Sequence, residues 1–243
     1  MPRGWLWAIT TRIKYSRIPE QVSLGVRVFC CTFVRDNLSH QNSMERASAK
    51  ILLLTAIPDE LGQHAIQELS PLCEIRFTGV GKLRAFEATL SAVAEGDYDH
   101  IINVGTCGSF HHPGATILYP SSITQGDIYI SSPFATTPIS LGTGCEKTSI
   151  VSSDNFIGSD TAPSQIELLK PYDCMDMECY AIARAIAYNA ERRGKAMPKL
   201  HLIKIVSDAA DGTVEEWSQR IERLQAALLE ATLSKIKTLT EAQ

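Results

Sequence analysis

The sequence lacks the motifs that identify several common metal sites and hydrolases. Its seven cysteines include no CxxC pair, and Cys30 and Cys31 are adjacent, so neither a zinc ribbon nor a disulfide framework is expected. There is no HExxH metalloprotease motif and no GxSxG nucleophile elbow. We therefore expect no bound metal ion, and the free thiols favour a reducing, cytoplasmic location.

Glycine-rich nucleotide loops are also incomplete. Gly79 and Gly81 would need a third glycine three residues later to form a dinucleotide fingerprint, and Arg84 occupies that position. A phosphate-binding GxxxxGK[ST] loop fails at two of its fixed positions, which are Arg76 and Leu83 here. The sequence thus predicts no cofactor.

The chain has no surplus of positive charge of the kind that binds nucleic acid. It has 243 residues with a formal net charge of −4, and 44% of them are hydrophobic and 21% charged. That length can bury one sizeable core, and one domain is favoured over two. We expect a small-molecule ligand, with neither nucleic acid nor a membrane as partner.

The first 43 residues differ from the rest of the chain. They contain six Lys and Arg residues against only Glu20 and Asp36, and their apolar patches are too short to span a bilayer. An Arg-rich, acid-poor segment fits an organelle-targeting peptide, or an upstream extension with Met44 as the true start. We expect residues 1–48 to be an extension, disordered or outside the core, and residues 49–243 to form the folded domain.

From Lys50 onward, short apolar runs alternate with amphipathic segments. Strands are expected at 51–56, 75–78, 100–104, 149–152 and 200–206, and helices at 59–69, 82–94, after Glu178 and from about residue 215. Residues 117–134 are predicted to form strands separated by turns, and residues 136–144 a loop. This alternation is typical of an α/β fold whose mostly parallel sheet carries helices on both faces.

Acidic residues lie beside two of the predicted elements. Asp208 follows the apolar run of residues 200–206 with only Ser207 between, at the end of a strand where open α/β sheets bind ligands. Glu178 begins the helix that carries Ile182 and Ile186. Two carboxylates in one crevice suggest acid/base chemistry on a small polar molecule. Each also has a structural alternative, because Asp208 is suited to capping a turn and Glu178 to the start of a helix.

Six short strings occur in order across roughly residues 50–235. They are TAIPDE from Thr55, TGVGK from Thr78, NVGTCG from Asn103, SDNFI from Ser153, MDME from Met175 and VSD from Val206. The series resembles the purine nucleoside phosphorylase superfamily, most of all its hydrolytic branch, the 5′-methylthioadenosine/S-adenosylhomocysteine nucleosidases. The resemblance implies a three-layer α/β/α sandwich with a mixed, mostly parallel central sheet, and cleavage of a ribose–purine bond.

That chemistry passes through a cationic sugar and needs an acid for the departing base. Asp208, positioned by Ser207, is our candidate for protonating purine N7, and Glu178 for binding the ribose hydroxyls and favouring the cation. In the nucleosidases the glutamate that matches Glu60 activates the attacking water. The resemblance places the remaining substrate contacts at Met177 on the sugar, Phe156 on the base, and Ile157, Thr78, Thr106, Cys107, Gly108 and Lys204.

Two departures from the family bear on the reaction. Lys204 stands where the nucleosidases have an arginine that helps to orient water, and it lacks the guanidinium fork. Asn103 occupies the position of a phosphate-binding arginine in the phosphorylases, which favours water as the nucleophile. A phosphate-dependent phosphorylase and a non-catalytic nucleoside-binding homologue are the alternatives. The resemblance also implies a homodimer.

Overall fold

The structure, a computed structural model, describes residues 49–128, 137–209 and 214–241. The predicted extension, residues 1–48, lies outside the described residues. The strands are β1 (Ile51–Thr55), β2 (Glu74–Phe77), β3 (His100–Gly108), β4 (Ile117–Leu118), β5 (Pro120–Gln125), β6 (Ile139–Ser140), β7 (Cys145–Ser152), β8 (Cys174–Asp176) and β9 (Lys199–Asp208). The helices are α1 (Pro58–Leu69), α2 (Lys82–Glu95), α3 (Pro163–Leu169), α4 (Cys179–Arg193) and α5 (Val214–Glu241).

The nine described strands form one mixed, mostly parallel sheet, in which seven follow the order β2-β1-β3-β8-β7-β5-β6, β9 pairs with β3, and β4 pairs with β9. β3 is its centre, because it pairs in parallel with β1 and, along its whole length, with β9. Gly108, the last residue of β3, also pairs with Met175 of β8, which runs antiparallel to β3. The carboxyl ends of β1, β3 and β9 therefore meet at the same edge of the sheet.

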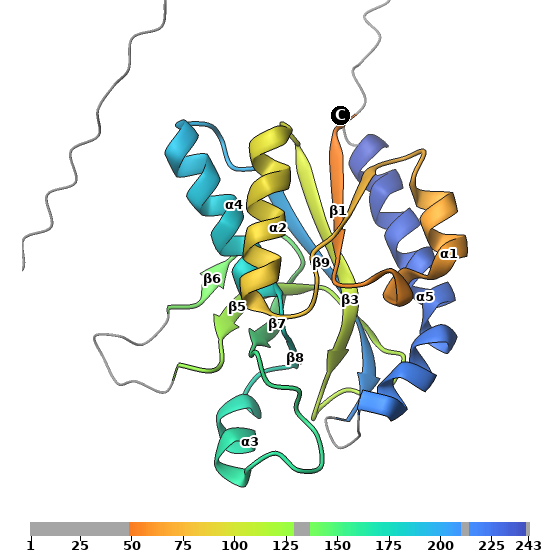
Figure 1. Ribbon diagram of the computed structural model, residues 1–243, viewed down its shortest axis with the longest axis vertical. Helices are drawn as coiled ribbons and strands as arrows, with labels where there is room; N and C mark the ends of the chain where they lie inside the picture. The colour runs from red at the N-terminus through yellow and green to blue at the C-terminus, as the bar shows by residue number, and fades with distance from the viewer. Residues whose placement is uncertain (1–48, 129–136, 210–213, 242–243) are drawn as a thin grey trace, which may run out of the picture. The chain divides into compact units, whose positions relative to one another are not determined.

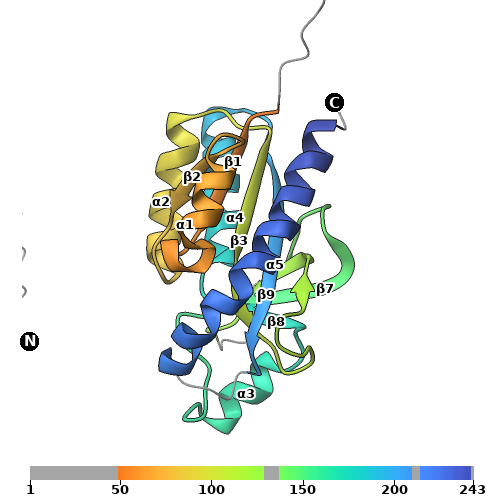
Figure 2. The same cartoon turned by 90° about the vertical axis from the view of Figure 1, so that its right-hand side faces the viewer.

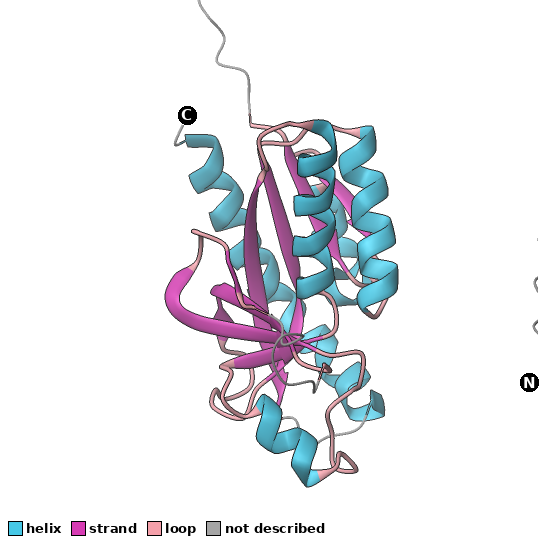
Figure 3. Ribbon diagram, turned by 90° about the vertical axis from the view of Figure 1, so that its left-hand side faces the viewer, coloured by secondary structure: helices cyan, strands magenta, loops and turns pink. Residues whose placement is uncertain are grey.

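Helices cover both faces of the sheet, and β1 shows why. Its side chains alternate, so that Leu52 and Leu54 pack in the core beneath α2 and α4, while Ile51 and Leu53 pack beneath α1 and α5. Both sides of the strand are buried, which explains its unbroken apolar sequence. Figures 1 and 3 show α2 and α4 side by side on one face, and Figure 2 shows α1 and α5 on the other. The three-layer architecture predicted from the sequence is confirmed.

Several boundaries differ from the sequence prediction, and each depends on a distant pairing partner. β3 continues to Gly108 instead of ending at residue 104, because β9 pairs with it throughout. β7 begins at Cys145, and β6 lies inside the expected loop of residues 136–144, because both strands pair with β5. The short helix α3 was not expected. None of the described helices is long and apolar enough to cross a membrane.

Candidate active site

A cavity of about 320 Å³ opens at the shared carboxyl edge of β1, β3 and β9, a volume suited to a small-molecule ligand. It brings together ten of the twelve site residues predicted from the sequence: Glu60, Thr106, Cys107, Gly108, Phe156, Ile157, Met177, Glu178, Ser207 and Asp208. These residues come from the ends of β3 and β9, the first turn of α1, the loop after β7, and the two residues between β8 and α4.

Asp208 is the last residue of β9 and is buried in the cavity wall. Its position follows from an irregularity in the β3–β9 pairing, which shifts register between Cys107 and Gly108 and sets Asp208 opposite Gly108. The Ser207 hydroxyl donates to Asp208 Oδ2 over 2.6 Å and lies 3.2 Å from the Cys107 carbonyl. A neighbouring side chain thus fixes the orientation of the predicted acid.

Glu178 immediately precedes α4 but does not cap it, since its side chain makes no capping hydrogen bond. Asp176 receives the hydrogen bond from the Cys179 amide instead, at 3.0 Å. Glu178 Oε1 accepts a hydrogen bond from the Gly81 amide at 2.9 Å. Burial, reinforced by the nearby charge of Asp176, raises the pKa of Glu178 to about 8. The carboxyl group is thus mostly protonated at neutral pH.

Lys204, predicted to bind substrate, does not line the cavity. Its ammonium lies 2.9 Å from Asp176 Oδ2, and both side chains are almost fully buried. Burial alone would raise the pKa of Asp176, but Lys204 and the hydrogen bonds from Cys179 and Ser152 outweigh it and lower that pKa. The charge of Lys204 is therefore balanced behind the cavity wall.

Thr78 also lies outside the cavity lining. Its hydroxyl is 3.0 Å from the Gly79 carbonyl and 3.4 Å from the Thr55 carbonyl. The adjacent Gly79 has a φ of 75°, a conformation that favours glycine. Thr78 is thus part of the turn after β2 and not of the cavity lining.

Glu60 is held by four hydrogen bonds from the protein. Oε1 accepts from the amide and the hydroxyl of Thr106, both at 2.8 Å. Oε2 accepts from the Thr55 hydroxyl at 3.0 Å and the Ala56 amide at 3.1 Å. These four donors hold both carboxylate oxygens of Glu60 in place at the cavity wall.

Sequence reasoning missed three notable members of the cavity wall: Val80, Asp176 and Trp217. Trp217 lies in the first turn of α5, and its indole N–H donates to Thr106 Oγ1 at 3.1 Å. Asp176 lies within the MDME string, so its proximity to Glu178 was the one available signal. No local pattern marks Trp217.

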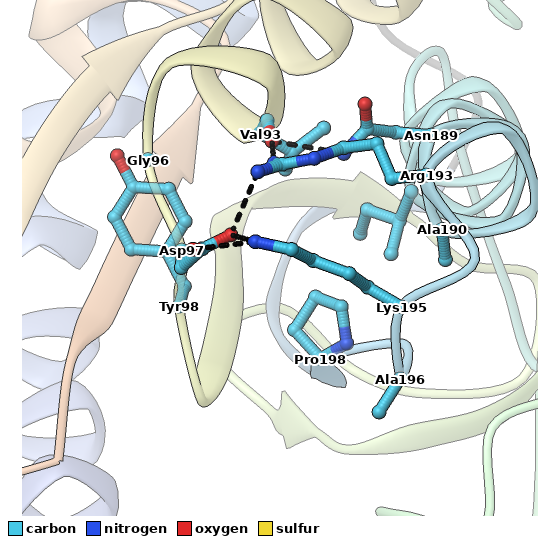
Figure 4. Close-up of a pocket in the computed structure, with 11 residues that line it drawn as sticks. Val93, Gly96, Asp97, Tyr98, Asn189, Ala190, Arg193, Lys195, Ala196 and Pro198 are labelled. Atoms are coloured by element: carbon cyan, nitrogen blue, oxygen red, sulfur yellow. Dashed lines mark hydrogen bonds and ion pairs between the residues drawn. The ribbon is translucent and has the colours of Figure 1, made fainter.

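A second cavity, of about 290 Å³, lies between the ends of α2 and α4 and contains none of the predicted site residues. Asp97 forms ion pairs there with Arg193 and Lys195, as Figure 4 shows. All three of these side chains are substantially exposed to solvent. Across the described residues, no group of three His, Cys, Asp or Glu side chains is placed to hold a metal ion.

Comparison with known proteins gives matches in structure only, because no family model and no curated protein sequence matches the chain. The 5′-methylthioadenosine nucleosidase of Arabidopsis thaliana superposes with a TM-score of 0.65 at 19% identity, covering 82% of this chain and 98% of that one. A 5′-methylthioadenosine/S-adenosylhomocysteine nucleosidase from Neisseria meningitidis, in complex with methylthio-immucillin-A, gives 0.61 at 17% identity, with coverage of 77% and 98%. Futalosine hydrolase of Helicobacter pylori gives 0.61 at 16% identity, with coverage of 81% and 99%. At these identities the likeness establishes the fold, which is that of the nucleosidases.

Proposed function

We propose that this protein is a nucleosidase that hydrolyses the N-glycosidic bond of an adenine-type nucleoside, such as 5′-methylthioadenosine or S-adenosylhomocysteine. The observation that carries the proposal is that Asp208, Glu178 and Glu60 line one ligand-sized cavity. These are the three carboxyl groups that the reaction needs at the base, the sugar and the water. The fold shared with solved nucleosidases supports the same reading.

The departing base takes its proton from Asp208. Cleavage leaves negative charge on the purine, and a proton delivered to N7 neutralises it as the bond to C1′ breaks. The Ser207 hydroxyl, 2.6 Å from Asp208 Oδ2, holds the carboxyl group in one orientation. A positioned general acid of this kind contributes about 10²- to 10⁴-fold to the rate.

Glu178 responds to the charge that develops on the sugar. With a pKa of about 8 it is mostly neutral before substrate binds, which limits the cost of burying it. A cationic sugar beside it favours the ionised form, which then stabilises the transition state and accepts hydrogen bonds from the ribose hydroxyls. We expect a cationic sugar analogue to release a proton when it binds.

The charge of the cavity favours water over phosphate as the nucleophile. Its lining includes the acidic residues Glu60, Asp176, Glu178 and Asp208, and within the described chain it includes no Lys, Arg or His. Lys204, behind the wall, is already paired with Asp176. The internal segments outside the described residues, 129–136 and 210–213, also contain no basic residue in sequence. A phosphate dianion would therefore find no basic side chain among the described lining residues, whereas a neutral water meets Glu60 as a base.

A panel of purine nucleosides with free-base detection, run with and without phosphate, tests the proposal. Release of adenine together with a free sugar, unchanged by phosphate, is the expected result. Formation of ribose-1-phosphate, or dependence on phosphate, would establish the phosphorylase alternative. Calorimetric binding of adenosine analogues with no base released on long incubation would identify a non-catalytic binding protein.

We also propose that the protein is a cytoplasmic homodimer. Exposed apolar side chains support the dimer: Val80 and Phe156 are 43% and 36% exposed although they line the cavity, and Leu83, the second residue of α2, is 80% exposed. Lys82 forms ion pairs with Asp127 and Asp154 beside them. Sedimentation velocity of the wild type and of Leu83→Asp tests this, and a wild type that stays monomeric at micromolar concentration would refute it.

A further inference from the structure

Trp217 lies in the first turn of α5 and lines the cavity, and its indole N–H is directed to a threonine and not to one of the three carboxyl groups. Its single polar atom donates to Thr106 Oγ1 at 3.1 Å. Thr106 belongs to β3, 111 residues earlier in the sequence. The contact therefore joins the start of the last helix to the strand end that carries Glu60's main donors.

The direction of this chain of hydrogen bonds follows from its chemistry. An indole N–H can only donate, so Thr106 Oγ1 accepts from Trp217. The one proton of the threonine hydroxyl must then go elsewhere, and Glu60 Oε1 lies 2.8 Å away. An ionised carboxylate only accepts. The order Trp217 to Thr106 to Glu60 is thus the only one that satisfies every atom.

Glu60 has little freedom to move away from this contact. A Cβ added at Gly105 would lie 2.9 Å from Glu60 Oε1, so the carboxylate already fills the space against β3. Its four protein donors use all of the roughly four acceptor positions of a carboxylate. A water that gives its proton to Glu60 must therefore replace one donor. The Thr106 hydroxyl suits this exchange because it lines the cavity and can rotate, unlike the backbone amides.

We propose that Trp217 is a positioning residue for water activation. Its indole N–H holds the Thr106 oxygen in place, so that the hydroxyl proton can point either to Glu60 or to a water or sugar bound in the cavity. This inference rests on the proposed function, in which Glu60 is the base. With the indole in place, the threonine oxygen stays fixed while its proton is redirected to the incoming water or sugar. Without it, the whole Thr106 side chain is free to rotate, and Glu60 loses a hydrogen-bond donor that the indole had oriented and polarised.

Trp217→Phe keeps an aromatic ring in the wall and removes only the N–H. We expect kcat to fall about threefold to tenfold, as for the loss of one hydrogen bond, with KM within about twofold. The acid limb of the kcat–pH profile should move to higher pH. Thr106→Val should lower kcat further than Trp217→Phe does, whereas Thr106→Ser should keep most of the wild-type kcat. Adding Trp217→Phe to Thr106→Val should lower kcat no further.

Gln225→Met provides a matched control. Gln225 lies on the same helix and donates to the Asp59 carbonyl at 2.7 Å, next to Glu60. It lies outside the relay, by which we mean the two hydrogen bonds that link Trp217 to Thr106 and Thr106 to Glu60. Its replacement loosens the α1–α5 contact without touching Thr106, so it should leave the pH profile unchanged. A Trp217→Phe enzyme with wild-type kcat and pH profile, or additive losses in the double variant, would overturn the proposal.

A measurement that needs no turnover separates this proposal from the proposed function. The infrared carboxyl band of Glu60, identified by its loss in Glu60→Gln, can be titrated in the wild type and in Trp217→Phe. A titration that moves to higher pH in Trp217→Phe supports the relay even if the wild type hydrolyses no nucleoside. If the wild type is active and Trp217→Phe changes neither the titration of the band nor the rate, the relay is refuted while the proposed function stands.

Discussion

Replacing Glu178 by glutamine should remove a large pH dependence from the stability of the fold. The pKa of Glu178 rises from an ordinary value of 4.5 to about 8 because the side chain is buried, at 7% exposure, beside Asp176. A carboxyl group whose pKa is raised on folding contributes stability that is fully present below pH 4.5 and is lost as the pH rises toward 8.

The size of the effect follows from the two pKa values. Each pH unit between them lowers the free energy of unfolding by about 1.4 kcal/mol, so at pH 7 the ionisation of Glu178 in the unfolded chain costs the fold about 3 kcal/mol. That is a substantial part of the roughly 5–15 kcal/mol typical of a domain. Glutamine is similar in shape, cannot ionise, and can still accept the hydrogen bond from Gly81.

Urea unfolding at pH 5, 7 and 8.5 measures this directly. Glu178→Gln should match the wild type within about 1 kcal/mol at pH 5 and exceed it by about 3 kcal/mol at pH 7, with unchanged m-values. Glu68→Gln, which removes an exposed carboxylate from α1, is the control and should show no such divergence. If the free energies of unfolding of the wild type and of Glu178→Gln change in parallel with pH, the pKa of Glu178 is not raised by folding, and the prediction is refuted.

Three further predictions concern the other buried charges. Asp208→Asn should lower turnover at least about 100-fold in the free-base assay while calorimetry shows binding largely retained; near-normal turnover would remove Asp208 from the role of acid. Lys204→Met should destabilise the fold by about 3–5 kcal/mol in urea, because it leaves Asp176 buried without its ion pair, and adding Asp176→Asn should recover part of the loss. If Lys204→Met were as stable as the wild type, the Lys204–Asp176 ion pair would contribute nothing to the free energy of unfolding. Gly105→Ala should displace Glu60, because Glu60 Oε1 would lie 2.9 Å from the new Cβ, and it should reduce turnover more than substrate binding. Equal turnover in the wild type and in Gly105→Ala would contradict the role of Glu60 as a base held at this position.

The site shows which predictions a local pattern can support. Asp208 and Glu178 were found because each follows a strand or begins a helix within a short recognisable string, and the strands lead to a common edge. Thr78 and Lys204 belong to equally recognisable strings, yet neither lines the cavity. A string identifies a position along the chain, whereas the direction and partner of its side chain depend on residues far away, such as Asp176 for Lys204.

The amino-acid sequence by itself determined the alternation of buried strands and amphipathic helices, the layered α/β architecture, and the carboxyl groups at the strand ends. These depend on periodicity and on chain direction, which are local properties. Only the tertiary structure decided that the pKa of Glu178 is raised, that Lys204 is paired with Asp176, and that Trp217 is linked to Glu60 through Thr106. Protonation and hydrogen-bond direction depend on burial and on neighbouring charges, and folding alone brings those neighbours together.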